Sequence, residues 1–207
     1  SEVRRMIQLS FDFLFMCAAP IVVGLFVLAY PVIFLISSPE FLSRLSDGYY
    51  GSDIAMQILV FAMFFSFLNS LFSYTLVAAN KQSILLWING AAAIFNISAN
   101  LIVIPRWGFR GAAVNTVVTE ILILCAACYF AKKYVDFKIT FSTFFRTFFC
   151  AALMGTVVFF LKDPTYNLWG LQNFNVLLLG VIGVAVYGGL ILTTGAVPEE
   201  FRKRLSL

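Results

Sequence analysis

The sequence predicts an all-α, polytopic membrane protein: a helical bundle with about six transmembrane helices. Of its 207 residues, 61% are hydrophobic and only 12% are charged, and the mean hydropathy is +0.94. Soluble domains carry about 25% charged residues, so half that fraction cannot cover a surface that faces water. The apolar residues also form runs of roughly 20, the length that a helix needs to cross a hydrocarbon layer of about 30 Å.

Short polar stretches separate the six segments that we expect to cross the membrane. Pro20 lies inside the first segment and is expected to kink it in mid-membrane, because proline removes a backbone hydrogen bond. A polar loop at 37–53 follows, and the third and fourth segments meet at a polar corner, Pro105–Arg110. The expected helices span residues 9–36, 54–79, 84–104, 111–131, 144–161 and 174–194.

We expect a single transmembrane domain over residues 1–207, with a basic cytoplasmic connection at 132–146 and a loop at 162–173. The chain begins with Ser1 rather than Met, which suggests a fragment or a processed chain. Cytoplasmic loops carry an excess of Lys and Arg. With both termini in the cytoplasm, ten of the 14 Lys and Arg residues lie on that side and four on the other. The chain is therefore predicted to have both ends inside the cell.

The sequence lacks the motifs by which enzymes and metal sites are commonly recognised. There is no histidine, which removes the usual proton carrier at neutral pH and the commonest transition-metal ligand. Cys125 and Cys128 are spaced as C-x-x-C, but no second pair accompanies them, so they are expected to be packing residues. We predict a protein that is not an enzyme and that has no bound cofactor, metal or nucleic acid.

Polar residues inside the apolar segments are the candidates for function. Asn89, Asn96 and Asn100 recur at helical spacing on one face of the third segment. They could bond the hydroxyl groups of a sugar or equally serve as hydrogen-bonding contacts between helices. Asn69 lies on a face of the second segment that also carries serines and is more typical of packing.

Glu120 is the sharpest candidate, because it lies in the middle of the fourth segment. A carboxylate at bilayer depth costs about 2.5–3.5 kcal/mol on insertion scales, so such residues usually face a cavity or a partner. Two alternatives stay open: a transport role, or a protonated side chain bonded to a neighbouring helix. Arg106 and Arg110 flank the polar corner and could meet a phosphate, although corner arginines mostly contact water or lipid.

The stretch NISANLIVIPRWGFRGAAVNTVVTE, residues 96–120, resembles the C-terminal part of the polysaccharide transporter family. These proteins are the O-antigen and capsule flippases of the multidrug/oligosaccharidyl-lipid/polysaccharide (MATE-like) superfamily. The pattern is an Asn-rich helix that ends in Ile-Pro, then Gly-x-x-Gly-Ala-Ala and a helix with a Thr-Glu pair. The matching residues here are Asn96, Asn100, Ile104, Pro105, Gly108, Gly111, Ala112, Ala113, Thr119 and Glu120.

The resemblance implies the second lobe of a flippase that moves undecaprenyl-linked oligosaccharide across a bacterial inner membrane by alternating access. The substrate would be an O-antigen, capsule or exopolysaccharide repeat unit. The implied partners are the lipid-linked oligosaccharide, membrane lipids, a missing N-terminal lobe, and the polysaccharide polymerase and chain-length machinery of lipopolysaccharide biosynthesis. The alternatives are a drug or cation exporter of the same superfamily and a non-transporting assembly partner of polysaccharide synthesis.

Overall fold

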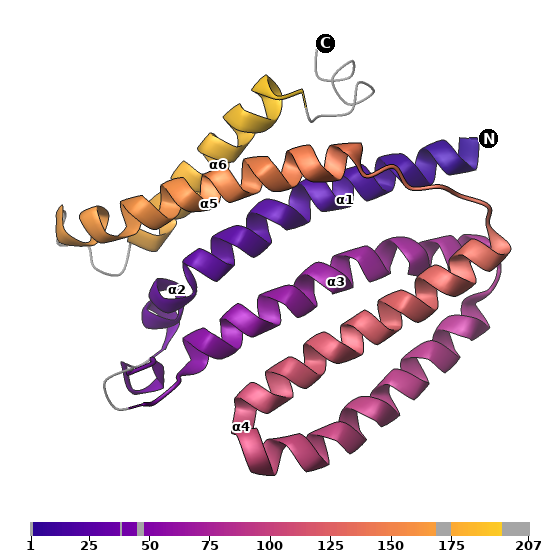
Figure 1. Cartoon of the computed structure of the whole chain (residues 1–207), viewed down its shortest axis with the longest axis horizontal. Helices are drawn as coiled ribbons and strands as arrows, with labels where there is room; N and C mark the ends of the chain where they lie inside the picture. The colour runs from indigo at the N-terminus through magenta and orange to yellow at the C-terminus, as the bar shows by residue number, and fades with distance from the viewer. Residues whose placement is uncertain (1, 38, 45–47, 169–174, 196–207) are drawn as a thin grey trace. The chain divides into compact units, whose positions relative to one another are not determined.

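The structure is a computed structural model that describes residues 2–37, 39–44, 48–168 and 175–195 of the chain, and it is built from helices (Figure 1). A short 3-10 helix, η1 (Pro39–Phe41), lies in the loop after the first segment. The α-helices are α1 (Glu2–Val27), α2 (Ala29–Ile36), α3 (Ser52–Ala78), α4 (Gln82–Tyr134), α5 (Ser142–Leu168) and α6 (Asn175–Thr193).

The lengths of these helices confirm the predicted all-α, multi-pass membrane architecture. Among the described residues, α1, α3, α4, α5 and α6 are long and apolar enough to cross a membrane. Helix α4 has 53 residues, which at 1.5 Å per residue is about 80 Å, more than twice the thickness of the hydrocarbon layer. Because α4 is bent in the middle, each of its arms is long enough for one crossing, which gives six candidate crossings within the described residues.

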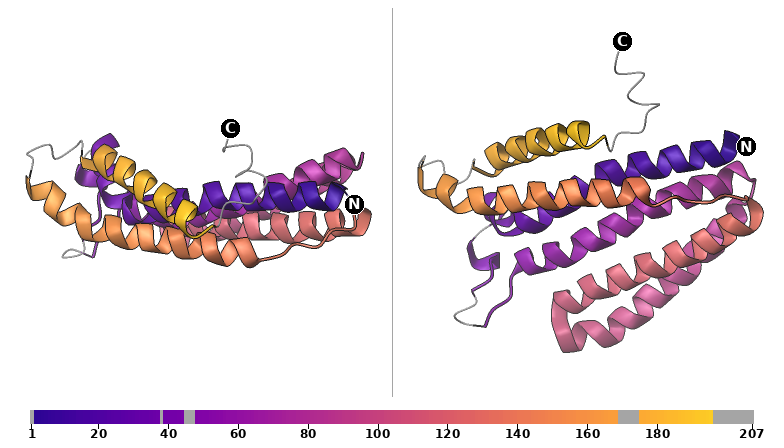
Figure 2. Two further views of the ribbon diagram at one scale, coloured as in Figure 1. Left: turned by 90° about the horizontal axis from the view of Figure 1, so that it is seen from above. Right: turned by 45° about the horizontal axis from the view of Figure 1, so that its top comes forward.

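Helix α4 folds back on itself as a hairpin, which Figure 1 and the right-hand view of Figure 2 both show. Its first arm comprises residues 82–107 and its second arm residues 109–134. The bend is a single residue, Gly108, whose φ of 60° and ψ of −148° lie outside the helical region. Essentially only glycine adopts such a conformation. The predicted corner at Pro105–Arg110 is therefore correct in position, but its backbone stays helical on both sides of Gly108.

Gly111 allows the second arm to start in close contact with the end of the first. A Cβ atom at this position would overlap Cγ1 of Val103 and would lie 3.0 Å from Cβ of Trp107. Gly111 and Ala113 are both buried. The interpretation of these small residues as a close-contact face between helices is confirmed.

The first predicted segment differs from the structure in the place where it is interrupted. Helix α1 continues through Pro20 to Val27, and a new helix begins at Ala29. The residue between them, Leu28, has φ of −95° and ψ of 11°. Pro31 explains this position, because its ring conflicts with the carbonyl four residues earlier, at Val27, and it cannot donate a hydrogen bond there. The helical hydrogen-bonding pattern is thus interrupted next to Pro31, while α1 stays helical through Pro20, the predicted position of the kink.

Two further boundaries were predicted incorrectly. Helix α4 includes Lys132 and Lys133 in its last turn, and α5 begins at Ser142, so the connection between them is 135–141 rather than 132–146. Helix α5 also continues to Leu168, into the predicted loop at 162–173. The last residues of that loop, and the basic residues Arg202, Lys203 and Arg204, lie outside the described part of the chain.

The chain divides into two compact units, and the long helices α1 and α3 each contribute to both. Unit 1 comprises Ser1–Leu14 and Ile58–Ile139, and unit 2 comprises Phe15–Gln57 and Thr140–Leu207. In unit 1, Arg4 forms an ion pair with Asp136, and the rings of Phe72 and Phe137 are 5.8 Å apart. These contacts hold the start of α1 and the end of α3 against the segment that follows α4.

Unit 2 is held together by aromatic and small side chains of α1, α5 and α6. The rings of Phe15 and Phe144 are 4.2 Å apart, and the Tyr187 hydroxyl donates a 2.7 Å hydrogen bond to the carbonyl of Met16. A Cβ at Gly155 would overlap Cγ1 of Val23. Helices α1 and α5 therefore approach closely at this glycine, in the way that small residues permit in membranes.

Candidate functional site

The candidate site is a pocket of about 370 Å³ between the two arms of α4 in unit 1. Its polar side chains come from both arms, because the bend at Gly108 turns the Asn-rich face of the first arm toward the Thr-Glu face of the second. The pocket is lined by Asn89, Ala92, Ala93, Asn96, Ile97, Thr116, Thr119, Glu120 and Ile123. The pattern of apolar floor and a few convergent polar groups is typical of small-molecule sites.

A ladder of hydrogen bonds ties the two arms together beside this pocket. Asn96 Nδ2 donates to Thr119 Oγ1 at 2.8 Å, and Asn115 Nδ2 donates to Asn100 Oδ1 at 3.0 Å. Asn115 Nδ2 also reaches the carbonyl of Asn96 at 3.0 Å, while Asn100 Nδ2 donates to Asn96 Oδ1 at 3.0 Å. The arms are therefore antiparallel in a fixed register, with Asn96 opposite Thr119 and Asn100 opposite Asn115.

These bonds bear on the two alternatives that the sequence left open for the asparagines. The side-chain amides of Asn96 and Asn100 are engaged between the arms, which fits the role of contacts between helices. Asn96 also lines the pocket, whereas Asn100 does not. Asn89 lies on the pocket wall about two helical turns before Asn96, and its side chain is exposed. Of the three, Asn89 and Asn96 are therefore the ones placed to meet a ligand.

Glu120 is bound to Asn69, a residue of α3. Asn69 Nδ2 donates to Glu120 Oε2 at 2.6 Å and to the Glu120 carbonyl at 3.3 Å. Asn69 is only 7% exposed, and its Oδ1 is buried without a hydrogen-bond partner in the described part of the chain. An unsatisfied buried acceptor is uncommon. Asn69 therefore holds Glu120 through its Nδ2 and keeps one buried acceptor, Oδ1, without a partner among the described residues.

Arg106 and Arg110 lie apart from this pocket. Both side chains are exposed at the bend of α4, and neither belongs to the residues that line the pocket. The ladder pairs Asn100 with Asn115 between the bend and the pocket-lining residues, so the pocket begins on the far side of that pair. We predicted that Arg106 and Arg110 belong to one substrate site together with the asparagines. The pocket contains Asn89 and Asn96 but neither arginine.

Asn115 and Thr119 are the residues that the sequence reasoning missed as members of the site. Both are buried, at 5% and 8% exposed, and both hold the arms in register. The signal was present in the sequence, since Asn115 and Thr119 are four residues apart and share a helical face. Pairing them with Asn96 and Asn100 requires the position of the bend, which only Gly108 defines.

The charged and polar groups of the pocket limit its chemistry. Glu120 is the charged residue in its lining, and within the described residues no group of three His, Cys, Asp or Glu side chains could hold a metal ion. Amide and hydroxyl groups can bind hydroxyl-rich or cationic molecules, and a carboxylate can exchange a proton. The arrangement is suited to binding and to proton exchange within a membrane span.

We compared the chain with protein-family models and with curated proteins. No family model matches this chain. It is similar to the uncharacterized membrane protein MJ1068 of Methanocaldococcus jannaschii, with 25% identity over 144 residues. The match covers 67% of this chain but 28% of that protein, so the chain spans little more than a quarter of the relative's length. Together with the apolar helices, this similarity identifies a multi-pass membrane protein.

Proposed function

We propose that this chain is the second lobe of a transporter that flips lipid-linked oligosaccharide across a bacterial inner membrane by alternating access. The observation that carries the proposal is the pocket between the α4 arms, where amide and hydroxyl side chains converge within two membrane crossings. Such groups bond sugar hydroxyls, and polar residues inside a membrane usually mark a substrate or ion path. The family resemblance of residues 96–120 supports the same function.

In this proposal the α4 hairpin moves as one body. The hydrogen bonds between Asn96, Thr119, Asn100 and Asn115 fix the two arms in register, so the pocket keeps its shape while the lobe rocks against the rest of the transporter. Asn89 and Asn96 bind the glycan, and Glu120 with Asn69 is the titratable group that links transport to a driving ion. No step of this scheme breaks a covalent bond, so the proposed activity is transport and not catalysis.

A second candidate is a drug or cation exporter of the same superfamily, and one observation favours it. The charge in the pocket lining is the carboxylate of Glu120, and a carboxylate attracts cations, whereas a phosphate-bearing glycolipid requires basic groups. In the flippase, the phosphate would be bound by Arg106 and Arg110 at the bend or by the other lobe.

Complementation separates these candidates. The longer protein that contains this chain should restore surface glycan to a strain that lacks its own O-antigen flippase, and residues 1–207 alone should not. Resistance to cationic dyes without restored glycan would establish the exporter instead. Full glycan export by residues 1–207 alone as a monomer would contradict the half-transporter proposal.

Accessibility labelling tests the orientation that the proposal requires. In unit 1, Arg4, Lys81, Lys132 and Lys133 gather at one end, as the contacts Arg4–Asp136 and Lys81–Tyr134 indicate, and Arg106 lies at the bend. With the native cysteines replaced by alanine, a membrane-impermeant thiol reagent added outside intact cells should modify Trp107→Cys. It should modify Gln82→Cys only after lysis. The reverse pattern would place the termini outside.

A further inference from the structure

A second, apolar pocket of about 430 Å³ lies between the same two arms of α4, farther from the bend. It adjoins the polar pocket, because Ala92 and Ile123 line both. Its aromatic side chains are Trp87, Phe95 and Phe130, and its small ones are alanines. The full lining is Trp87, Ile88, Ala91, Ala92, Phe95, Leu122, Ile123, Ala126 and Phe130. The two pockets overlap along the first arm, and the apolar pocket, which we call the groove, extends farther toward the open end of the hairpin, to Trp87 and Phe130.

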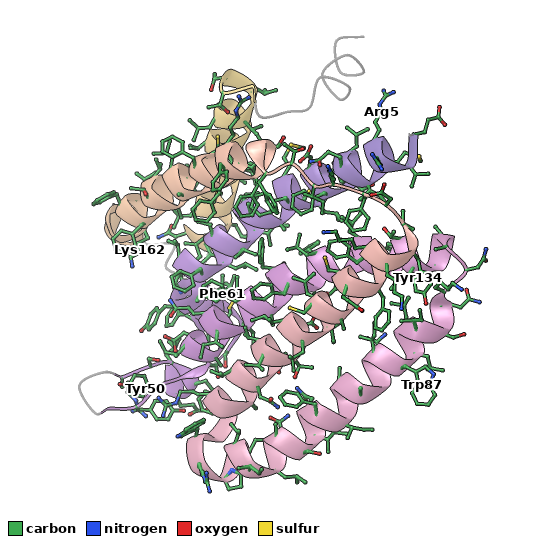
Figure 3. All side chains as sticks on the ribbon, turned by 45° about the vertical axis from the view of Figure 1, so that its right-hand side comes forward. Arg5, Tyr50, Phe61, Trp87, Tyr134 and Lys162 are labelled. Carbon is green, nitrogen blue, oxygen red and sulfur yellow. The ribbon has the colours of Figure 1, made fainter. Side chains whose placement is uncertain are left out.

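Two lysines, Lys81 and Lys133, lie at the open end of the α4 hairpin, beyond the residues that line this pocket. The Nζ of Lys81 is 4.9 Å from the centre of the Tyr134 ring, and the Nζ of Lys133 is 6.0 Å from it. The two ammonium groups therefore approach one ring from opposite ends of α4. The carboxylate that is nearest to them in sequence, Asp136, is paired with Arg4. Figure 3 shows Trp87 and Tyr134 toward the same end of the hairpin.

We infer that this groove holds one acyl chain of an anionic phospholipid, whose phosphate lies between Lys81 and Lys133. Apolar walls of this composition match a hydrocarbon chain, and an anion between two ammonium groups that flank one ring is attracted by both. Basic and aromatic side chains gather where the headgroups of a membrane lie. The occupant is a phospholipid because the pocket is lined from a single hairpin, whose open face within the membrane meets lipid. The inference is independent of the transported substrate.

Native mass spectrometry tests this inference. The full chain is purified in a mild detergent and released from it in the mass spectrometer, and the lipid that stays bound is measured. The probes are phosphatidylglycerol, which is anionic, and phosphatidylcholine, which is zwitterionic, with identical acyl chains. We expect one phosphatidylglycerol to remain bound at collision energies that remove phosphatidylcholine. The double variant Lys81→Gln/Lys133→Gln should reduce the preference for phosphatidylglycerol by more than about tenfold. The single variants Lys81→Gln and Lys133→Gln should each reduce the preference, whereas Lys162→Gln, the control of equal charge change from unit 2, should retain it.

Filling the groove gives the second arm of the test. Ala91→Phe and Ala126→Phe place a ring inside it from the first and second arm, and both should abolish retention of either lipid. Ile94→Phe, at an exposed position of the first arm that does not line the groove, should bind as the unchanged chain does. Ala91 is itself exposed, so Ala91→Phe is expected to fold, which its elution as a sharp monomer peak will verify.

Three results would overturn the inference. Equal retention of the two lipids by the unchanged chain would remove the headgroup site, and undiminished retention by a folded Ala91→Phe chain would remove the groove as the binding place. A dimer of the unchanged chain that Ala91→Phe converts to a monomer, with lipid retention unaltered, would show that a second copy occupies the groove.

Discussion

Replacing Gly111 by alanine is expected to lower the stability of the chain markedly, because the added methyl group has no space. Its Cβ would overlap Cγ1 of Val103 and would lie 3.1 Å from the Val103 carbonyl oxygen. Valine is stiff at χ1, so the clash can be relieved only by separating the arms of α4. Overpacking of this kind costs about 1–3 kcal/mol. The measurement is the unfolding temperature in detergent, followed by the fluorescence of Trp87 and Trp107 on α4.

Gly90 provides the matched control within the same helix. A Cβ at Gly90 meets no atom within 4 Å, and alanine is favoured over glycine in a helix interior by about 1 kcal/mol. Gly90→Ala should therefore leave the unfolding temperature unchanged or raise it. Adding Val103→Ala to Gly111→Ala should recover part of the loss. Equal unfolding temperatures for Gly111→Ala and Gly90→Ala would contradict the contact between the arms.

The hairpin of α4 could be predicted from sequence because two signals agree at one place. Two apolar runs of membrane length meet at Pro105–Arg110, and Gly108 and Gly111 lie within and just after that corner. What the sequence did not reveal is that a single residue makes the bend. A six-residue polar stretch is typical of a turn. A helix can nevertheless continue through such a stretch when only one residue, here Gly108, leaves the helical conformation.

The site could be predicted only in part, because a helix face is a property of one segment and a hydrogen bond joins two. The spacing of Asn96 and Asn100 placed them on one face of the first arm, and this face does meet the second arm. Their partner Asn115 depends on the register between the arms, and Asn69 reaches Glu120 from α3, 51 residues earlier in the chain. No periodicity within one segment carries that information.

The same reason explains why Pro20 was preferred to Pro31. Both prolines remove a hydrogen bond, and the sequence does not show which position tolerates the loss. In the structure the helix continues through Pro20, and the interruption at Leu28 is small: Leu28 N–H bonds the Gly24 carbonyl and Val32 N–H bonds the Leu28 carbonyl, both at 2.9 Å. The effect of a proline inside a membrane helix is decided by its neighbours.

Under the proposed flippase function, replacing Glu120 by glutamine is expected to abolish most glycan export while leaving the fold intact. A glutamine can accept the hydrogen bond that Asn69 Nδ2 gives to Glu120 Oε2 at 2.6 Å. Glutamine also has nearly the same size and shape as glutamate, so the packing around the buried Asn69 is kept. Insertion should therefore be maintained or improved, since the cost of a buried carboxylate disappears. The variant removes the titratable charge and keeps the packing.

The measurement is export per inserted molecule of the longer protein, with Glu2→Gln, an exposed residue at the start of α1, as the control of equal charge change. If Glu120 exchanges the proton that drives transport, export should fall by at least about tenfold, which corresponds to about 1.4 kcal/mol, while Glu2→Gln has no effect.

If Glu120 is permanently protonated and serves only as a contact to α3, glutamine replaces it well and export is unchanged. Normal export at normal abundance would therefore remove Glu120 from the transport site and leave Asn89 and Asn96 as the residues that face the substrate. Glu120→Ala cannot make this distinction, because it also deletes the 2.6 Å hydrogen bond from Asn69 Nδ2 and leaves that donor only the longer bond to the backbone carbonyl of residue 120.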